Sequence, residues 1–180
     1  MINLSRIDTP SAVVFDVDGV LTSGSFFYSI EGKVLKDFGP DDSDALGLLA
    51  SLTEVRFISG DRKGFEITRR RVSEDMGFAL DLVSTHSRAK WLESKYDLSG
   101  IVYVGDGIFD HLVMQKVGYA IAIAGALPHV VQSADWVTTR SGGNRAVAEA
   151  VLHLVEKFWP NVDILSGDTI QDRAQGEWAK

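Results

Sequence analysis

The chain has 180 residues, a length that suits one domain with its own hydrophobic core. Acidic side chains outnumber basic ones by 25 to 18, and the net charge of −7 argues against non-specific binding to nucleic acid or to an anionic membrane surface. The absence of cysteine excludes disulfides, zinc–thiolate sites and thiol nucleophiles. No apolar run approaches the roughly 20 residues of a membrane helix and no signal-peptide pattern is present, so we expect a cytoplasmic protein.

The first strong structural signal is the run at residues 12–17, which is apolar on both faces and typical of a central parallel strand. Residues 26–38 follow as two β-rich segments around a glycine-containing turn, the pattern of a hairpin. A polar segment at residues 40–43 then precedes an apolar-periodic stretch at 45–52, which predicts a helix.

From residue 55 onward, predicted strands and helices alternate. This alternation implies right-handed βαβ units, so the predicted fold class is α/β: a Rossmann-like three-layer sandwich with a mostly parallel sheet and a β-hairpin flap after strand 1. We assign residues 1–158 to this domain and 159–180, which have no clear period, to a C-terminal tail. Strand patterns lie at 55–59, 79–83, 101–105, 119–123 and 136–138, and helical patterns at 64–76, 87–96, 109–117, 128–133 and 144–158.

Chemistry-bearing residues follow four of the predicted strands. In an open parallel sheet, ligands bind at the carboxyl ends of the strands, and unrelated surface residues would scatter over both edges. The residues that the strand ends bring to one edge are Asp16, Asp18, Ser59, Gly60, Lys90, Asp106 and Asp110.

The four carboxylates, the hydroxyl and the ammonium group in this set fit one reaction. Clustered carboxylates repel one another unless a cation separates them, and oxygen ligands without a histidine cluster suit Mg²⁺. A carboxylate on that ion can attack phosphorus and become an aspartyl phosphate, while the hydroxyl and the ammonium group stabilise the charge of the transition state. A second carboxylate two residues on can protonate the leaving oxygen and later activate water.

These segments resemble the four motifs of the haloacid-dehalogenase superfamily of phosphatases. Residues 16–22 resemble the first motif, Ser59-Gly60 the second, Lys90 the third and residues 105–110 the fourth. The intervals between them hold only a hairpin with a helix and then helix–strand–helix, so we expect no cap domain.

The capless form, the start of the first motif and the pair Gly142-Gly143 are similar to the 3-deoxy-manno-octulosonate 8-phosphate phosphatase group. That group includes the phosphatase-like domains of acylneuraminate cytidylyltransferases. The resemblance implies a Mg²⁺-dependent phosphomonoesterase that acts on a small phosphorylated sugar or sugar acid, of the 3-deoxy-octulosonate 8-phosphate or nonulosonate 9-phosphate type. It also implies a homotetramer. Because no cap excludes water from the site, we expect the hairpin and tail of a neighbouring subunit to do so.

The resemblance also implies a role for each residue of the set. Asp16 would be the nucleophile and Asp18 the general acid/base. Ser59 and Gly60 would bind a phosphoryl oxygen, and Lys90 would neutralise phosphate charge and orient Asp16. The metal ligands would be Asp16, Asp18 through its main-chain carbonyl, Asp106, and Asp110 as a supporting acid.

Two segments depart from the pattern of that group. Its usual Gly-Gly-Arg-Gly-Ala-Val-Arg-Glu appears at residues 142–149 with one arginine shifted to Arg145, a candidate substrate-binding residue, and the other replaced by Ala148. Asp41 and Asp42 stand where the group often carries an Arg-Asp-Gly-type segment. Because acids in place of a cation weaken recognition of a carboxylate, the sequence supports phosphatase chemistry better than octulosonate specificity.

Two functions of other classes stay open. A non-catalytic oligomerisation or regulatory domain would share this fold, but it need not retain the acids, Ser59 and Lys90. A response-regulator receiver also places an aspartate, a hydroxyl and a lysine on a parallel sheet, but receivers are shorter and lack this first motif. At single positions, Asp110 also suits the start of a helix, and Asp61 competes with Ser59 as a helix N-cap.

Overall fold

The computed structural model describes residues 7–164 and has a six-stranded parallel sheet at its centre. The sheet order is β5-β4-β1-β6-β7-β8, so the chain starts in the middle, builds one side and then returns to build the other. The predicted Rossmann-like α/β class is confirmed, and no cap domain is present among the described residues. The strands are β1 (Ala12–Asp16), β4 (Glu54–Ser59), β5 (Ala79–Leu82), β6 (Ile101–Gly105), β7 (Tyr119–Ala122) and β8 (Trp136–Val137).

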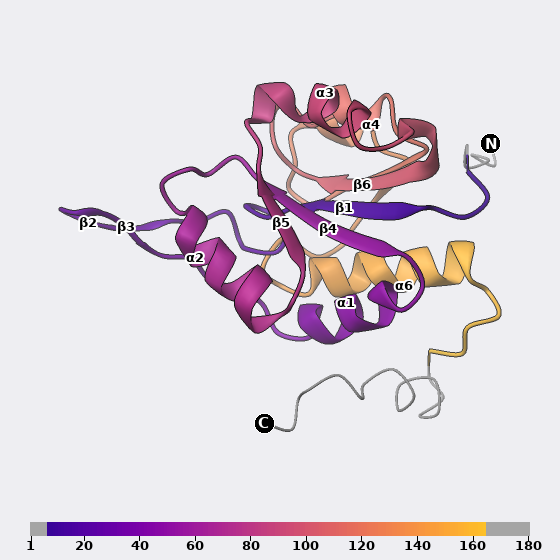
Figure 1. The fold of residues 1–180 in the computed structure, drawn as a ribbon, viewed down its shortest axis with the longest axis horizontal. Coiled ribbons are helices and arrows are strands. Elements are labelled where there is room, and N and C mark those ends of the chain that lie inside the picture. The colour runs from indigo at the N-terminus through magenta and orange to yellow at the C-terminus, as the bar shows by residue number, and fades with distance from the viewer. Residues whose placement is uncertain (1–6, 165–180) are drawn as a thin grey trace.

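Helices cover both faces of this sheet, as Figure 1 shows. On one face lie α1 (Asp42–Ala50) and α6 (Ala146–Phe158). On the other lie α3 (Arg88–Glu93), α4 (His111–Met114) and α5 (Pro128–Val131). The predicted helix at 64–76 is α2 (Phe65–Arg69) followed by a π-helical segment, η1 (Arg70–Asp75), and short 3₁₀ turns form η2 (Thr85–Ser87) and η3 (Leu98–Gly100).

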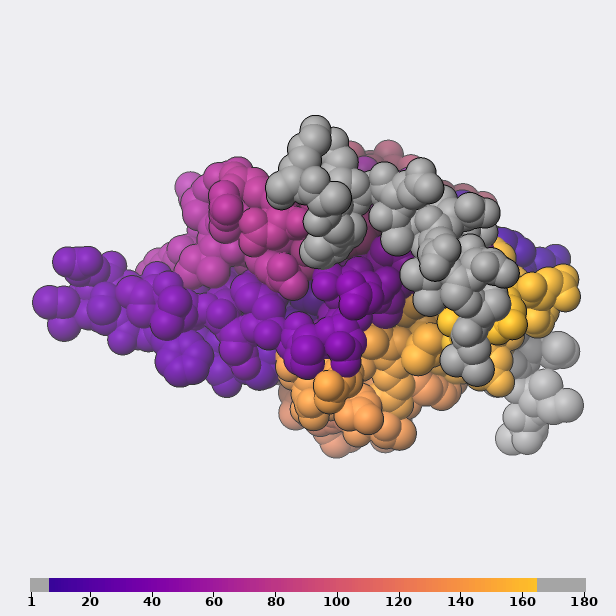
Figure 2. All heavy atoms as spheres, turned by 90° about the horizontal axis from the view of Figure 1, so that it is seen from below, coloured from indigo at the N-terminus to yellow at the C-terminus, as the bar shows by residue number. Residues whose placement is uncertain are grey.

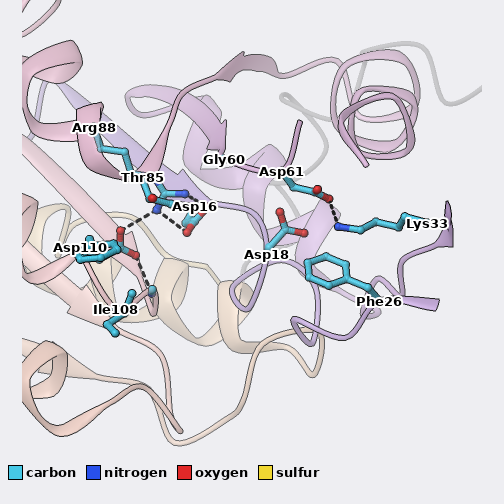
Figure 3. Close-up of a pocket in the computed structure, with 12 residues that line it drawn as sticks. Asp16, Asp18, Phe26, Lys33, Gly60, Asp61, Thr85, Arg88, Ile108 and Asp110 are labelled. Carbon is cyan, nitrogen blue, oxygen red and sulfur yellow. Dashed lines mark hydrogen bonds and ion pairs between the residues drawn. The ribbon is translucent and has the colours of Figure 1, made fainter. Parts of the chain in front are cut away.

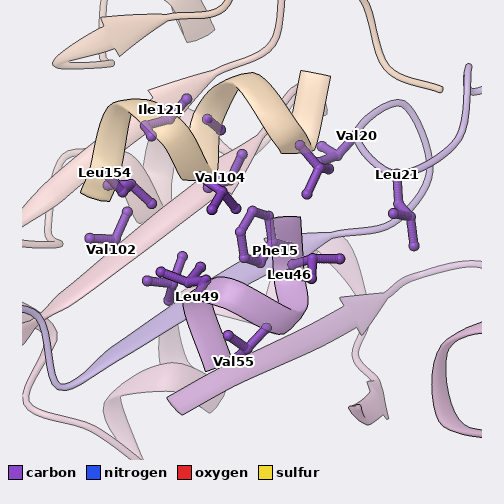
Figure 4. Close-up of a cluster of buried hydrophobic side chains, with 14 of the residues drawn as sticks. Phe15, Val20, Leu21, Leu46, Leu49, Val55, Val102, Val104, Ile121 and Leu154 are labelled. Atoms are coloured by element: carbon purple, nitrogen blue, oxygen red, sulfur yellow. The ribbon is translucent and has the colours of Figure 1, made fainter. Parts of the chain in front are cut away.

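Strand β1 is buried along its whole length and supplies both hydrophobic cores. Its alternate side chains point to opposite faces: Val13 and Phe15 join the core under α1 and α6, and Val14 joins the core under α3 and α4. Figure 4 shows Phe15 between Leu49 of α1 and residues of the sheet. Full burial of such side chains contributes about 1.5–3 kcal/mol each, which fixes the end of β1 in place.

A hairpin of β2 (Phe27–Ser29) and β3 (Gly32–Leu35) leaves the body of the protein between β1 and α1. It extends beyond the rest of the molecule in Figures 1 and 2. Gly32 has φ of 128°, a turn conformation that side chains rarely adopt, which explains the position of the turn. The predicted hairpin flap is present.

The first residues of the predicted tail are packed against the body. Trp159, Val162 and Ile164 contact the core under α1 and α6. The remainder of the tail, residues 165–180, lies outside the described residues. Within residues 7–164, no helix combines the length and the apolar character needed to cross a membrane.

Candidate active site

A pocket of about 380 Å³ opens at the carboxyl edge of the sheet. Strand β1 lies here between β4 and β6, at the point where the strand order reverses, which is the usual ligand position in open parallel sheets. Figure 3 shows Asp16, Arg88 and Asp110 at one end of the pocket and Asp18, Asp61, Lys33 and Phe26 at the other.

Asp16 is the last residue of β1, and its carboxyl is buried. Its two oxygens accept hydrogen bonds from the two terminal nitrogens of Arg88, at 2.6 and 2.9 Å, and one also accepts from the N–H of Val17 at 2.7 Å. Burial raises the pKa of Asp16 to about 7 against the opposing effect of Arg88, and the charge of Asp110 adds to the rise. A further positive charge beside this carboxyl would lower its pKa and favour the ionised form.

Three carboxylates converge beside that position. Asp16, Asp106 and Asp110 each offer an oxygen, and these oxygens lie within 4.8 Å of one another. Burial and the neighbouring charges of Asp16 and Asp110 raise the pKa of Asp106 to about 7. One oxygen of Asp106 is buried with no hydrogen-bond partner. An oxygen-only donor set with an unpartnered buried oxygen fits a hard divalent cation.

Asp110, at the start of α4, is saturated with hydrogen bonds. One oxygen accepts from Arg88 at 2.7 Å and from the Tyr103 hydroxyl at 2.9 Å. The other accepts from the backbone N–H groups of Asp106 at 3.1 Å and Gly107 at 2.9 Å. Asp110 therefore fixes both the guanidinium and the loop that carries Asp106, a supporting position behind the other two acids.

The loop after β1 approaches Asp106 through Gly19. A Cβ at this position would lie 2.1 Å from the Asp106 carboxylate, and its φ of +91° is one that side chains rarely adopt. A glycine is thus required for the first and fourth motifs to meet.

The Asp18 side chain points away from the three-carboxylate cluster. It accepts a hydrogen bond from Ser59 Oγ at 3.0 Å, so two residues 41 positions apart in the sequence meet in the pocket. Its other oxygen lies 2.7 Å from Lys36 Nζ in an ion pair that lacks hydrogen-bond alignment. The Lys36 ammonium group is wholly buried and also contacts Asp61 at 2.9 Å and Thr68 Oγ1 at 2.8 Å.

Lys36 was not a candidate from the sequence. A lysine after a hairpin strand normally has a solvated side chain, and nothing in the local pattern shows that β3 brings it back to Asp18.

The structure does not bring Lys90 to the lining of this pocket. Its side chain is exposed on α3, whereas Arg88, two residues earlier, is 2% exposed and lies between Asp16 and Asp110. Residues two apart on a helix point about 200° away from each other, so only one of the pair can face the pocket. The cation beside Asp16 is therefore the guanidinium of Arg88.

Comparison with known proteins gives these motifs a family. No protein-family model matches the sequence. The 3-deoxy-D-manno-octulosonate 8-phosphate phosphatase KdsC of Salmonella typhi is 31% identical over 158 residues, which cover 81% of this chain and 79% of the relative. KdsC of Escherichia coli K12 is 30% identical over the same coverage. This chain belongs to the KdsC family.

Solved structures of the family have the same fold. A probable YrbI-family phosphatase of Pseudomonas syringae superposes with a TM-score of 0.74 at 29% identity, over 85% of this chain and 89% of its own. The cobalt-bound octulosonate 8-phosphate phosphatase of Haemophilus influenzae gives a TM-score of 0.76 at 23% identity, over 92% and 99%. The likeness to the Haemophilus influenzae structure shows the fold alone.

The residues at which this sequence departs from the usual pattern of the family, among them Asp41, Asp42 and Arg145, lie away from the pocket. Arg145 precedes α6, is exposed and forms an ion pair with Asp41. Asp42 is buried at the start of α1 and accepts the N–H of Ala148 at 2.9 Å. Burial raises the pKa of Asp42 to about 6. The structure does not bring Arg145 to the other predicted site residues, because Asp41 holds it between α1 and α6.

Proposed function

We propose that this chain is a Mg²⁺-dependent phosphomonoesterase that hydrolyses a small phosphorylated sugar or sugar acid through an aspartyl phosphate on Asp16. The observation that carries the proposal is the convergence of Asp16, Asp106 and Asp110 at the pocket, with a buried oxygen of Asp106 left unpartnered. Membership of the KdsC family, whose named relatives are phosphatases, supports the same reaction.

Asp16, Asp106 and the main-chain carbonyl of Asp18, with Asp110 behind them, would hold the Mg²⁺, which would supply positive charge to the carboxylates and to the phosphoryl group. Asp16 attacks phosphorus while the bond to the sugar oxygen breaks, and Asp18 donates a proton to that leaving oxygen. Water then attacks the aspartyl phosphate with Asp18 as the base, which releases phosphate and restores Asp16.

The other residues of the pocket bind and orient. Gly60 lines the pocket, and Ser59 Oγ, which donates to Asp18 in this structure, would donate to a phosphoryl oxygen together with the backbone at Gly60 when the substrate is bound. Arg88 holds Asp16 through both of its terminal nitrogens and stabilises phosphate charge, in the role that the sequence assigned to Lys90.

A homo-oligomer, a tetramer by resemblance, is part of the proposal. The hairpin exposes Phe27, Tyr28 and Ile30, a set of large apolar side chains that a second copy is suited to cover. The expected partners are thus this chain and a small substrate, with no nucleic acid or membrane, and the expected location is the cytoplasm. Light scattering of the wild type and of Ile30→Asp tests the assembly, since the added charge should lower its mass.

Phosphate release from a panel of sugar phosphates and phosphorylated sugar acids tests the reaction. Turnover is expected with Mg²⁺ and is expected to cease with EDTA. A panel that stays unhydrolysed with Mg²⁺, Mn²⁺ and Co²⁺ would contradict the proposal and favour a non-catalytic domain.

A further inference from the structure

The pocket beyond the phosphoryl site has mostly apolar walls. Phe26 lines it from the hairpin side, and Thr85, Ile108 and Phe109 line it from the opposite side. The faces of a sugar ring and aromatic side chains suit each other, and hydroxyl groups need only a few polar partners. The only cation that the described residues place on these walls is Lys33.

Lys33 is already paired. Its ammonium group lies 2.5 Å from an oxygen of Asp61 and 3.2 Å from the centre of the Phe26 ring. Lys36 reaches the same Asp61 oxygen at 2.9 Å. One carboxylate thus holds both lysines that the hairpin brings to the pocket, as Figure 3 shows for Lys33.

Asp61 is well placed to remain charged. Burial acts to raise its pKa, but the hydrogen bonds from Lys33 and Lys36 outweigh burial and hold the pKa below its usual value. Its second oxygen accepts the N–H of Gly64 at 3.1 Å, which fixes the orientation of the carboxylate.

The remaining candidate cations are also paired. Arg88 is bound by Asp16 and Asp110 at the inner end of the pocket. Arg145 is held by Asp41 away from the lining residues. Each cation among the lining residues of segment 7–164, Lys33 and Arg88, therefore already has a carboxylate partner.

We infer that Asp61 determines specificity, by making this site prefer phosphorylated sugars without a carboxylate over phosphorylated sugar acids. The inference rests on the proposed phosphatase function. A substrate carboxylate beside Lys33 meets the charge of Asp61, which already balances the charge of that ammonium group. A neutral sugar hydroxyl donates to Asp61 without disturbing the lysines.

The test compares kcat/KM for glucose 6-phosphate and 6-phosphogluconate, which share a carbon chain and a phosphate position; the second has a carboxylate at C1 and is therefore open-chain, so the change of preference in the Asp61 variant isolates the effect of the carboxylate. The wild type is expected to prefer glucose 6-phosphate by roughly 10- to 100-fold, the effect of one unpaired charged group. The substrate named in the KdsC relatives, 3-deoxy-D-manno-octulosonate 8-phosphate, is a third probe and is expected to be poorer than glucose 6-phosphate.

Asp61→Asn is the informative variant. Asparagine keeps an oxygen for the Gly64 N–H and removes the charge that holds Lys33 and Lys36. The preference for glucose 6-phosphate is expected to fall at least about tenfold, through a lower KM for 6-phosphogluconate. The double variant Asp61→Asn/Lys33→Met is the matched control, and it is expected to lose that gain.

Three outcomes would overturn the inference. A wild type that prefers 6-phosphogluconate overturns the inference and leaves the phosphatase function standing, and this measurement does not depend on the folding of any variant. An Asp61→Asn variant that lowers both activities equally overturns the specificity role of Asp61. If no probe is hydrolysed with any metal, the proposed function fails and the inference fails with it.

Discussion

Two acidic clusters of this protein have similar charge chemistry in different places. One surrounds Asp16 at the end of β1, and the other surrounds Asp42 at the start of α1. Burial raises the pKa of Asp16 to about 7 and that of Asp42 to about 6. Each cluster also holds a buried carboxylate oxygen without a partner, in Asp106 for the first and in Asp42 for the second.

The difference lies in what surrounds the acids. Around Asp16, carboxylates from the ends of β1 and β6 and from the start of α4 converge on one side of an open pocket. Asp42 instead accepts the N–H of Ala148 between two helices and lines no part of that pocket. A raised pKa and a buried oxygen without a partner are therefore common to both clusters, and the convergence of strand ends on a pocket is what distinguishes the cluster proposed as the active site.

The largest expected effect follows from Asp16→Asn, which removes the nucleophile. Phosphate release is expected to fall at least about 10⁴-fold. Thermal stability should be kept, because the variant removes one of several buried charges that repel one another. Single-turnover assays with scanning calorimetry check both points. A variant that keeps even a tenth of the wild-type rate would place the chemistry elsewhere.

Asp106→Asn is expected to lower activity roughly 10²- to 10³-fold, because it removes a ligand of the proposed Mg²⁺.

The apparent Mg²⁺ affinity of the wild type should also depend on pH. Burial raises the pKa values of Asp16 and Asp106 to about 7, so protons compete with the metal below that pH and affinity should weaken as pH falls from 8 to 6. Calorimetric titration with Mg²⁺ measures the affinity at each pH. An affinity that is unchanged between pH 8 and pH 6 would argue against Asp16 and Asp106 as ligands.

Arg88→Met is expected to lower activity roughly 10- to 100-fold, since it leaves Asp16 and Asp110 without their shared cation. Lys90→Ala is the matched control two residues along the same helix, and its exposed side chain should be dispensable. A steady-state comparison of the two variants decides which basic residue serves the site. Equal losses of activity in the two variants would contradict the assignment of this role to Arg88 alone.

These residues show where sequence reasoning succeeds and where it stops. Asp16, Ser59 and Asp106 each end or directly follow a buried strand, so the strand pattern alone places them at one edge of the sheet. Sequence reasoning did not identify Arg88, because the residues of α3 that face the pocket are set by the short turn η2 before it. A shift of two residues along a helix moves a side chain to the opposite face. Sequence reasoning did not identify Lys36, because its contact with Asp18 depends on how the hairpin folds back toward the edge of the sheet.

The smallest effects are expected for substitutions in the acidic cluster around Asp42. The folded-state pKa of Asp42 is raised, so its contribution to stability is fully present below the unfolded pKa near 4 and is lost as pH rises through about 6. Asp42→Asn removes that loss and should raise Tm at pH 8 but not at pH 4.5, with activity unchanged. Arg145→Ala, which removes an exposed ion pair, should change neither. Thermal scans at the two pH values test this, and a Tm gain of equal size at both would contradict it.

The hairpin of β2 and β3, with the residue that follows it, carries both exposed aromatic rings and buried lysines. Phe27 and Tyr28 present their rings to solvent, while Lys33 and Lys36 extend inward to the acids of the pocket. In the proposed oligomer, a neighbouring copy that covers the rings would also immobilise the ammonium groups, so subunit contacts and turnover would be linked without a separate effector. Specific activity per subunit is therefore expected to decline on dilution, together with dissociation of the assembly.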